Sequence, residues 1–368
     1  MFVKSILLDG FRNYSQSEIV FSDGVNVIIG KNAQGKTNLL EAVFFLSSGH
    51  SFRPSSEKDF ISFSGEGACI QAEITSGGRD QKLEARFFHG RRRELYANGV
   101  KLKKASELAG RLAAVVFGPD DLNIIKEGAA VRRKMMDQCL SQLRPGYASA
   151  LSEFNRLYDH KTRILRDYRE KPSLLELLDD FNYRLAEQSA RLIYYRSAFA
   201  GILSRKASNI HGEFSGATEA LDISYRTVGN LDASGKKPEQ LMPELLEHQR
   251  EHRQAELRSG LCLSGAHKDD LEININGAPA RRFASQGQAR TASVSIKLAE
   301  RDVHYDENGE YPVLLLDDVL SELDAARQSF ILAKITSGQI LITCCDDSIA
   351  INNPGAAILR IEGGRIVN

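Results

Sequence analysis

The segment GKNAQGKT, residues 30–37, limits the possible folds of this chain more than any other feature. It fits the pattern G-x-x-x-x-G-K-[ST] at every fixed position. The apolar segment VNVIIG, residues 25–30, runs into it, and residues 37–48 have the apolar spacing of a helix. A strand, a glycine-rich loop and a helix in this order predict a nucleotide-binding P-loop in an α/β fold.

The residue types of this loop suit the binding of a triphosphate. Gly30 and Gly35 let backbone N–H groups turn inward around a β-phosphate, and the following helix adds its positive N-terminal end. Lys36 supplies positive charge to the β- and γ-phosphates, and Thr37 offers its hydroxyl to Mg²⁺. The predicted binding residues are Gly30, Lys31, Asn32, Ala33, Gln34, Gly35, Lys36 and Thr37, with Lys36 also catalytic.

A second pattern, VLLLDDVLSELD, covers residues 313–324. Four apolar residues predict a buried parallel strand, and the carboxyl end of such a strand is where α/β sheets bind ligands. Asp317 is then a candidate Mg²⁺ ligand, and Asp318 a candidate catalytic residue that orients the attacking water. Ordinary strand-end or N-cap aspartates are the alternative, which the P-loop in the same chain makes less favourable.

The stretch FASQGQART, residues 283–291, precedes a helical pattern. We expect Ser285 at the N-cap and Gly287 in the first turn of that helix. A plain capped helix is one interpretation. The other is an anion site, which would duplicate the P-loop unless it faces the nucleotide of a different molecule.

The remaining composition is that of an ordinary globular protein. Lys and Arg balance Asp and Glu at 48 each, so a globally basic nucleic-acid binder is not indicated. Basic clusters at 91–93, 132–134 and 281–282 are candidate nucleic-acid contacts or solvated faces. Five cysteines without a CxxC pair favour a reducing cytoplasm, and neither a signal peptide nor a membrane span is expected.

The chain divides by composition into three parts. Residues 1–126 and 257–368 are rich in strand patterns and are predicted to form one head, with the helical arm 127–256 inserted between them. Within the arm, two long helices are predicted over 135–168 and 174–205, separated at Pro172 and Ser173. Residues 68–100 are predicted to form a strand meander with a tight turn at Asn98–Gly99.

These motifs, in this order, resemble ABC-type ATPase heads of the SMC class, and within that class the RecF family of bacterial recombination mediators. The resemblance spans nearly the whole chain. It rests on FRNY (11–14), GKNAQGKTNLLEA (30–42), SFR (51–53), SGAHKDDL (264–271), FASQGQAR (283–290) and LLLDDVLSELD (314–324).

The resemblance implies roles for particular residues. The turn Ser285, Gln286, Gly287 and Gln288 would be the signature motif, which contacts the γ-phosphate of ATP held by a second subunit. Asp324 would belong to a D-loop at the same interface, and Arg12 and Asn13 would lie near the nucleotide. Arg53 would lie near phosphates or DNA.

The sequence departs from the usual pattern at several places, among them Ala266, where the resembling run usually has Pro. Asp318 stands where most ABC ATPases have Glu, which suggests slow hydrolysis, and Thr343 stands where many have a switch His. No clear Q-loop glutamine is present, so Asp120 or Asp121 is a candidate substitute. His267 with Asp269 and Asp270 is interpreted as a structural turn, with a metal site as the alternative.

Two functions remain open from the sequence. In the first, which the resemblance implies, ATP and Mg²⁺ would drive a homodimer that clamps duplex DNA near single-strand gaps. It would work with RecO- and RecR-like partners to help load a recombinase, and would release the DNA after slow, DNA-stimulated hydrolysis. In the second, the chain is an ATP-switched protein-interaction hub whose DNA contact is incidental. A transport ATPase or small-molecule kinase fits less well, since neither needs the whole set of motifs.

Overall fold

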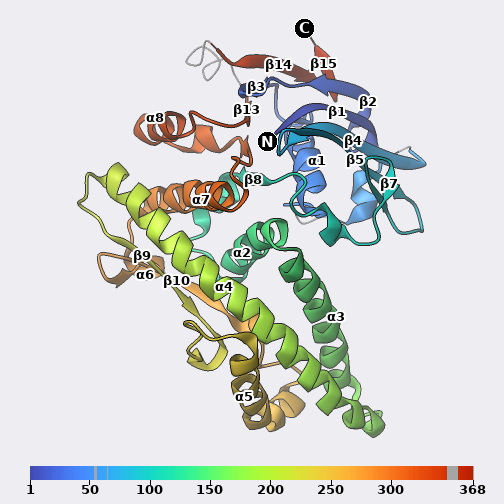
Figure 1. The fold of residues 1–368 in the computed structure, drawn as a ribbon, viewed down its shortest axis with the longest axis vertical. Coiled ribbons are helices and arrows are strands. Elements are labelled where there is room, and N and C mark those ends of the chain that lie inside the picture. Colours follow the sequence, from blue (N-terminus) through green and yellow to red (C-terminus); the bar gives the residue numbers. More distant parts are fainter. Residues whose placement is uncertain (54–55, 64, 346–354, 368) are drawn as a thin grey trace. The chain divides into compact units, whose positions relative to one another are not determined.

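The computed structural model describes residues 1–53, 56–63, 65–345 and 355–367. It comprises two compact units. The first contains Met1–Asn123 and Ser293–Asn368, and the second contains Ile124–Ala292. The first unit is therefore built from both ends of the chain, and the second is an insertion (Figure 1).

The first unit contains a six-stranded sheet in the order β15-β14-β3-β13-β12-β8. The four strand pairs from β14 to β8 are parallel, and β14 and β15 form an antiparallel hairpin. All five residues of β12 and of β13 are buried, as their apolar sequences predict. The strands are β3 (Val25–Ile29), β8 (Ala114–Phe117), β12 (Val313–Asp317), β13 (Ile340–Cys344), β14 (Ala357–Glu362) and β15 (Arg365–Val367).

A second, antiparallel sheet in the same unit has the order β2-β1-β4-β5-β6-β7. The predicted meander and its turn are confirmed, and Asn98 and Gly99 take φ values of 50° and 78°, as a two-residue hairpin turn requires. The strands are β1 (Phe2–Phe11), β2 (Tyr14–Val20), β4 (Gly67–Ser76), β5 (Arg79–Phe88), β6 (Glu94–Ala97) and β7 (Val100–Lys101).

Helix α1 (Lys36–Ser48) packs against strands of both sheets. This explains why every residue from Leu39 to Ser47 is buried, where a helix at a protein surface would bury a single apolar stripe. Phe45 contacts Phe60 and Phe87 edge to face, which joins the helix to the antiparallel sheet. The unit also contains α7 (Gln286–Asn308), which crosses into the second unit at Ala292–Ser293, and α8 (Ala325–Lys334).

The second unit is mainly helical, with a three-stranded sheet in the order β11-β10-β9. Helix α4 packs against α3, α5 and β9. The elements are α2 (Ala129–Leu143), α3 (Pro145–Asp167), α4 (Leu178–Ser215), β9 (Leu221–Arg226), α5 (Pro238–Ser259), β10 (Asp270–Ile275), β11 (Ala278–Pro279) and α6 (Ala280–Phe283).

One prediction for the arm is wrong. Residues 135–168 do not form one helix, because α2 ends at Leu143 and α3 begins at Pro145. Proline has no N–H to donate in a helix interior, but it fits the first helical position, where that N–H would be unpaired in any case. The predicted break at Pro172 and Ser173 is confirmed, since a short 3-10 turn, Pro172–Leu177, precedes α4.

The predicted division into lobes and arm uses different boundaries from the compact units. Residues 260–292 lie in the same unit as the arm helices, because β10 pairs with β9 along its whole length. The predicted lobes are defined by their order in the chain and their expected role, whereas the two compact units are defined by contacts in the structure. The division into 1–126, 127–256 and 257–368 therefore stays a prediction.

Across the described ranges, no helix combines the length and the apolar character that a membrane crossing needs.

Candidate nucleotide-binding site

The loop between β3 and α1 borders a cleft of about 380 Å³. Two glycines shape this loop. A Cβ atom on Gly30 would lie 2.5 Å from the carbonyl oxygen of Ile361, and Gly35 has a φ of 112° that side chains rarely allow. The cleft is lined by Asn13, Asn32, Ala33, Gln34, Gly35, Lys36, Thr37, Asn38, Arg53 and Asp318.

Lys36 is the first residue of α1 and is 4% exposed. Its Nζ donates to the carbonyl oxygens of Gly30 at 2.7 Å and Lys31 at 3.3 Å. It also lies 3.9 Å from Oδ2 of Asp318 and 3.5 Å from Sγ of Cys345. The structure therefore holds the cation of Lys36 inside the curve of the loop, at the wall of the cleft.

Asp317 and Thr37 meet although they are 280 residues apart in the sequence. The hydroxyl of Thr37 donates to Oδ1 of Asp317 at 2.9 Å, and the hydroxyl of Thr343 lies 3.0 Å from the same oxygen. Burial raises the pKa of Asp317 above its ordinary 3.8, while these two hydrogen bonds act in the opposite direction. A carboxylate and a hydroxyl side by side are hard oxygen donors, which suit Mg²⁺.

Asp318 follows β12 in the left-handed region, with a φ of 51°. Its backbone N–H donates to the hydroxyl of Thr343 at 2.8 Å, and its own carbonyl accepts from Ser321 at 2.6 Å. These contacts turn the Asp318 side chain into the cleft, which it helps to line. Thr343, at the position of the usual switch His, thus contacts both aspartates.

Arg12 and Asn13 occupy different surroundings. Arg12 makes two hydrogen bonds to the fully buried carboxylate of Glu41, at 2.8 and 2.9 Å, and its guanidinium lies over the ring of Phe60. It is not among the residues that line the cleft, whereas Asn13 is. A direct contact of Arg12 with nucleotide stays a prediction, and its observed contact is with Glu41.

Gln34 is held by the turn of the β14–β15 hairpin. The N–H of Gly363 donates to its side-chain oxygen at 2.6 Å, and the N–H of Gly364 donates to its carbonyl oxygen at 3.0 Å. Asn13 donates to the same carbonyl at 2.9 Å. The sequence motif predicts only that Gln34 binds nucleotide. The structure adds that the β14–β15 hairpin holds Gln34 in place.

Sequence reasoning missed two residues near the cleft. Asn38 accepts a hydrogen bond from Arg53 at 2.9 Å and donates to Asn13 at 2.8 Å. Glu41 bonds to Arg12 and Ser51 and lies 3.7 Å from Arg53. The available signal was an acidic residue in the apolar helix, four residues after the P-loop threonine, because a buried acid needs a charged partner.

The predicted helix cap at Ser285 is confirmed. Its hydroxyl accepts from the N–H of Gln288 at 3.2 Å, and the side chain of Gln288 accepts from the N–H of Ser285 at 2.9 Å. This reciprocal pair is a capping box, and it places Gln286 and Gly287 in the first turn of α7. The side chain of Gln288 also donates to Glu219 at 2.8 Å. Their contact with a partner's nucleotide stays a prediction.

Two other predicted residues have clear local roles. Asp324 caps α8 by accepting the N–H of Arg327 at 3.0 Å, which lowers the pKa of this carboxylate. Asp121 accepts the N–H of Gly118 at 2.8 Å and lies 3.9 Å from Lys297. Neither contact tests the proposed D-loop or Q-loop role.

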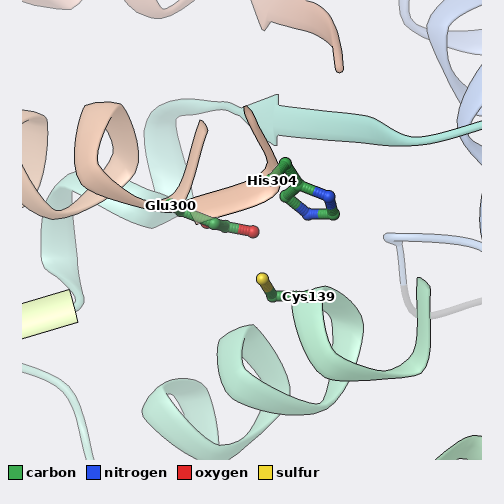
Figure 2. Close-up of side chains that lie close together, drawn as sticks. All are labelled: Cys139, Glu300 and His304. Carbon is green, nitrogen blue, oxygen red and sulfur yellow. The ribbon is translucent and has the colours of Figure 1, made fainter. Parts of the chain in front are cut away.

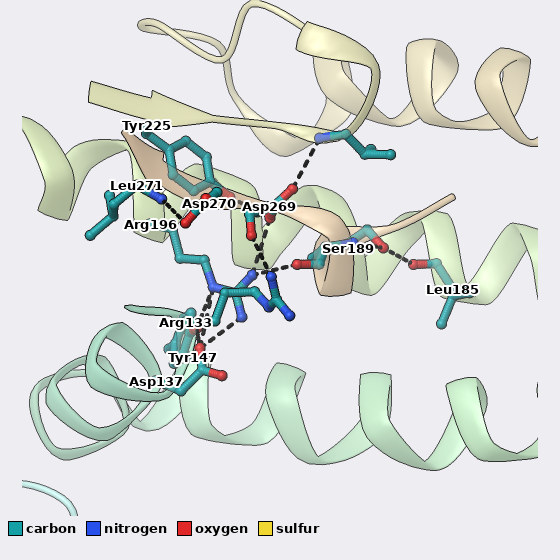
Figure 3. Close-up of polar contacts among 12 residues, drawn as sticks. Arg133, Asp137, Tyr147, Leu185, Ser189, Arg196, Tyr225, Asp269, Asp270 and Leu271 are labelled. Atoms are coloured by element: carbon teal, nitrogen blue, oxygen red, sulfur yellow. Dashed lines mark hydrogen bonds and ion pairs between the residues drawn. The ribbon is translucent and has the colours of Figure 1, made fainter. Parts of the chain in front are cut away.

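The run of His267, Asp269 and Asp270 forms a structural turn, as interpreted. Figure 3 shows Asp269 and Asp270 among arginines and tyrosines of the second unit. Asp269 is fully buried and bonds to Arg196 at 3.1 Å, to the hydroxyl of Tyr225 and to the N–H of Val228. Asp270 makes a two-point ion pair with Arg132, at 2.7 and 2.9 Å. Such neutralised carboxylates are structural groups.

Glu300 and His304 lie one turn apart on α7 (Figure 2). Cys139, also drawn there, belongs to the second unit. Glu300 pairs with Lys297 at 2.5 Å, and burial lowers the pKa of His304 to about 3. With its acid already paired, this helix face packs as buried polar core, and we assign no metal to it.

The parallel sheet, the P-loop and the acidic strand end together define a P-loop ATPase head of the SMC type. The family model described as "RecF/RecN/SMC N terminal domain" matches residues 2–360. A solved Smc head bound to the winged-helix domain of ScpA has the same fold, with a TM-score of 0.56 at 17% identity over 100% of this chain and 97% of that one.

More similar proteins identify the branch of this class. "DNA replication and repair protein RecF" of Acetivibrio thermocellus is 38% identical, with 99% of both chains covered. Its Listeria monocytogenes counterpart is 39% identical, with 91% of this chain and 90% of that one covered. A solved "recombination mediator protein RecF-ATPrS in RecFOR pathway" has a TM-score of 0.92 at 34% identity over 99% and 97% of the chains. This chain belongs to the RecF family.

The predicted α/β head of the SMC type and the predicted family are thereby confirmed.

Proposed function

We propose that this chain is an ATP-dependent DNA-binding protein of recombinational repair and replication. In this proposal, an ATP-bound homodimer clamps duplex DNA near single-strand gaps and helps to load a recombinase. The contact that carries the proposal is the pair Thr37–Asp317 beside Lys36, because it brings two hard oxygen donors together where Thr37 and Lys36 line the cleft. Solved RecF relatives, named as recombination mediators with ATP or an analogue, support the choice of nucleotide and pathway.

Nucleotide binding would use the groups that line the cleft. Backbone N–H groups of the loop would cradle the phosphates, and the ammonium of Lys36 would exchange its bonds to Gly30 and Lys31 for phosphate oxygens. Thr37 and Asp317 would hold Mg²⁺, which, when bound, neutralises charge on the β- and γ-phosphates. Asp318, in the cleft wall, would orient the attacking water.

The dimer would form across the triphosphate. Ser285, Gln286, Gly287 and Gln288, at the capped start of α7, would face the γ-phosphate bound by the other subunit, and Asp324 would lie at the same interface. The γ-phosphate adds charge-assisted hydrogen bonds that ADP cannot make. Because Asp318 has a shorter side chain than the usual glutamate, hydrolysis would be slow and would time the release of DNA.

The partners in this proposal are DNA and RecO- and RecR-like mediator proteins, in the cytoplasm. Contacts to DNA would be mostly to phosphate and therefore salt-sensitive. The second candidate function is the ATP-switched protein-interaction hub. One observation favours it: Arg132 and Arg133, in one of the three basic clusters, are engaged inside the protein with Asp270 and the carbonyl of Asp269.

Sedimentation of the Asp318→Asn protein with a fluorescent gapped duplex, in ATP and in ADP, tests this proposal. The substitution retains the P-loop contacts but weakens orientation of the water, so the ATP state should persist. We expect two protomers to sediment with the DNA in ATP and a monomer without DNA in ADP. A dimer that leaves the DNA behind would favour the hub, and a monomer in both nucleotides would contradict the shared ATP site.

A further inference from the structure

A groove of about 320 Å³ in the second unit has no role in the proposed ATP site. It runs beside β10 and α6, and all of its lining residues belong to this unit. Four of them are arginines: Arg132, Arg226, Arg281 and Arg282. The remainder are Ile125, Asp270, Leu271, Glu272, Ile273 and Pro279.

One edge of β10 is open where it borders this groove. The N–H of Asn276, just after β10, donates to the carbonyl of Ala220, just before β9. Hydrogen-bonded positions alternate along an antiparallel pair, so the backbone groups of even-numbered residues of β10 face β9 and those of odd-numbered residues face β11. Strand β11 pairs with Asn274 and Ile275 and then ends at Pro279. The carbonyl of Leu271 and the N–H of Ile273 therefore face a side on which β11 is absent.

Both residues line the groove and are more than nine-tenths buried. In the described chain, no residue is found to bond to the carbonyl of Leu271 or the N–H of Ile273 on this side. One acceptor and one donor, two residues apart on an open strand edge, are the two groups that a parallel added strand uses.

The charges around the edge divide into paired and free groups. Asp270 is bound by Arg132 at 2.7 Å, and Glu272 is bound by Arg226 at 2.5 Å. The side chains of Arg281 and Arg282 are exposed and make no ion pair with the described residues. They lie on α6, and the ammonium of Lys126 donates to the carbonyls of Ala280, its first residue, at 3.4 Å and of Ala284, just after it, at 2.6 Å. Two uncompensated positive charges thus stand on a fixed turn beside the open edge.

We propose that this groove binds an extended acidic peptide segment of a partner protein by strand addition to β10. One residue of the peptide donates to the carbonyl of Leu271 and accepts from the N–H of Ile273. Its neighbouring carboxylates pair with Arg281 and Arg282. A nucleic-acid backbone fits less well, because a phosphodiester offers no donor to Leu271 and meets the carboxylates of Asp270 and Glu272 in the same groove.

Fluorescence anisotropy without nucleotide tests this inference independently of the ATP-dependent function. The probe is a fluorescein-labelled hexapeptide of alternating Asp and Val, titrated with the full-length protein. We expect saturable binding that weakens at least tenfold in the double variant Arg281→Glu, Arg282→Glu. The matched control, Arg79→Glu with Arg92→Glu, changes the net charge equally at two other exposed arginines and should bind as the unaltered chain does. Circular dichroism checks that each variant is folded.

Two altered peptides separate strand addition from charge attraction. A peptide of alternating Lys and Val should not bind. A peptide with the same aspartates but N-methylated backbone amides should bind at least tenfold more weakly, because it cannot donate to Leu271. Equal binding of the methylated peptide, or equal binding by the Arg281→Glu, Arg282→Glu variant, would overturn the proposal. So would a labelled oligonucleotide that needs these arginines while the acidic peptide fails to bind.

Discussion

Two pairs of adjacent aspartates, one in each compact unit, have opposite surroundings. Asp317 ends the parallel strand β12 and Asp318 follows it, and their nearest partners are the hydroxyls of Thr37 and Thr343 and the ammonium of Lys36 at 3.9 Å. Asp269 precedes the antiparallel strand β10 and Asp270 begins it, and each is bound by an arginine at 3.1 Å or less. Figure 3 shows Asp269 beside Arg196.

The difference shows which carboxylates remain available for chemistry. A hydroxyl hydrogen-bonds to a carboxylate without cancelling its charge, so Asp317 can still attract a cation. A buried guanidinium does cancel that charge, and Asp269 with Arg196 is then part of the internal framework. The same dipeptide is thus placed for the proposed catalysis in one unit and for architecture in the other, and sequence alone does not separate the two.

The largest expected effect is on ATP turnover. We expect Asp318→Asn to lower the single-turnover hydrolysis rate by about 100-fold or more, since a positioned carboxylate that assists proton transfer contributes ~10²–10⁴-fold. Asp270→Asn should stay within about twofold of the unaltered rate, because its carboxylate has no place in the cleft. Equal losses in the two variants would remove the functional distinction between the pairs.

The order reverses for stability. Asp269→Ala leaves the buried Arg196 with one carboxylate partner fewer, so we expect the free energy of unfolding to fall by about 3–5 kcal/mol. Asp317→Ala removes a group bonded to two hydroxyls, and its loss should be about 1 kcal/mol. Urea denaturation followed by circular dichroism measures both. A larger loss at Asp317 would contradict the comparison.

Acid pH should weaken nucleotide binding through Asp317. Because burial raises its pKa above 3.8, this carboxylate takes up a proton at a higher pH than an exposed aspartate does. Protonation competes with Mg²⁺, so affinity for Mg·ATP should fall as the pH is lowered through the raised pKa and recover as it rises. Titration of a fluorescent ATP analogue between pH 5 and 8, roughly the range in which proteins remain most stable, checks this. Asp317→Asn should show a flatter profile.

The smallest effect concerns the brace on the P-loop. A Cβ atom on Gly364 would lie 2.3 Å from the carbonyl oxygen of Asn13, whereas on Gly363 it would meet no atom within 4 Å. Both residues have positive φ, so Gly363→Ala controls for backbone strain. We expect Gly364→Ala to weaken ATP binding by about tenfold, equivalent to ~1.4 kcal/mol, and Gly363→Ala to change it by less. Equal affinities would mean that the hairpin turn does not hold Gln34 in its binding position.

Short-range patterns carried most of what the sequence predicted correctly. The P-loop, the buried strand before Asp317 and the cap at Ser285 depend on residues within a few positions of one another, so local geometry determines them. The partners of Gln34 and Glu41 depend on how distant segments meet. Gly363 lies 329 positions from Gln34, and Arg12 lies 29 positions from Glu41. No rule based on sequence spacing predicts such contacts. Nor does one predict that one aspartate pair is bound by hydroxyls and the other by arginines.

The place of β3 in its sheet has a consequence for the newly made chain. Strand β3, which leads into the P-loop, is synthesised among the first thirty residues, but both strands that flank it, β13 and β14, lie after residue 339. During synthesis on the ribosome, both edges of β3 lack their native partner strands while more than 300 further residues are made. A product that ends before Ile340 would contain the complete P-loop motif but neither of the two strands that flank β3. The chain would then become able to bind ATP only late in synthesis, after its C-terminal strands have been made.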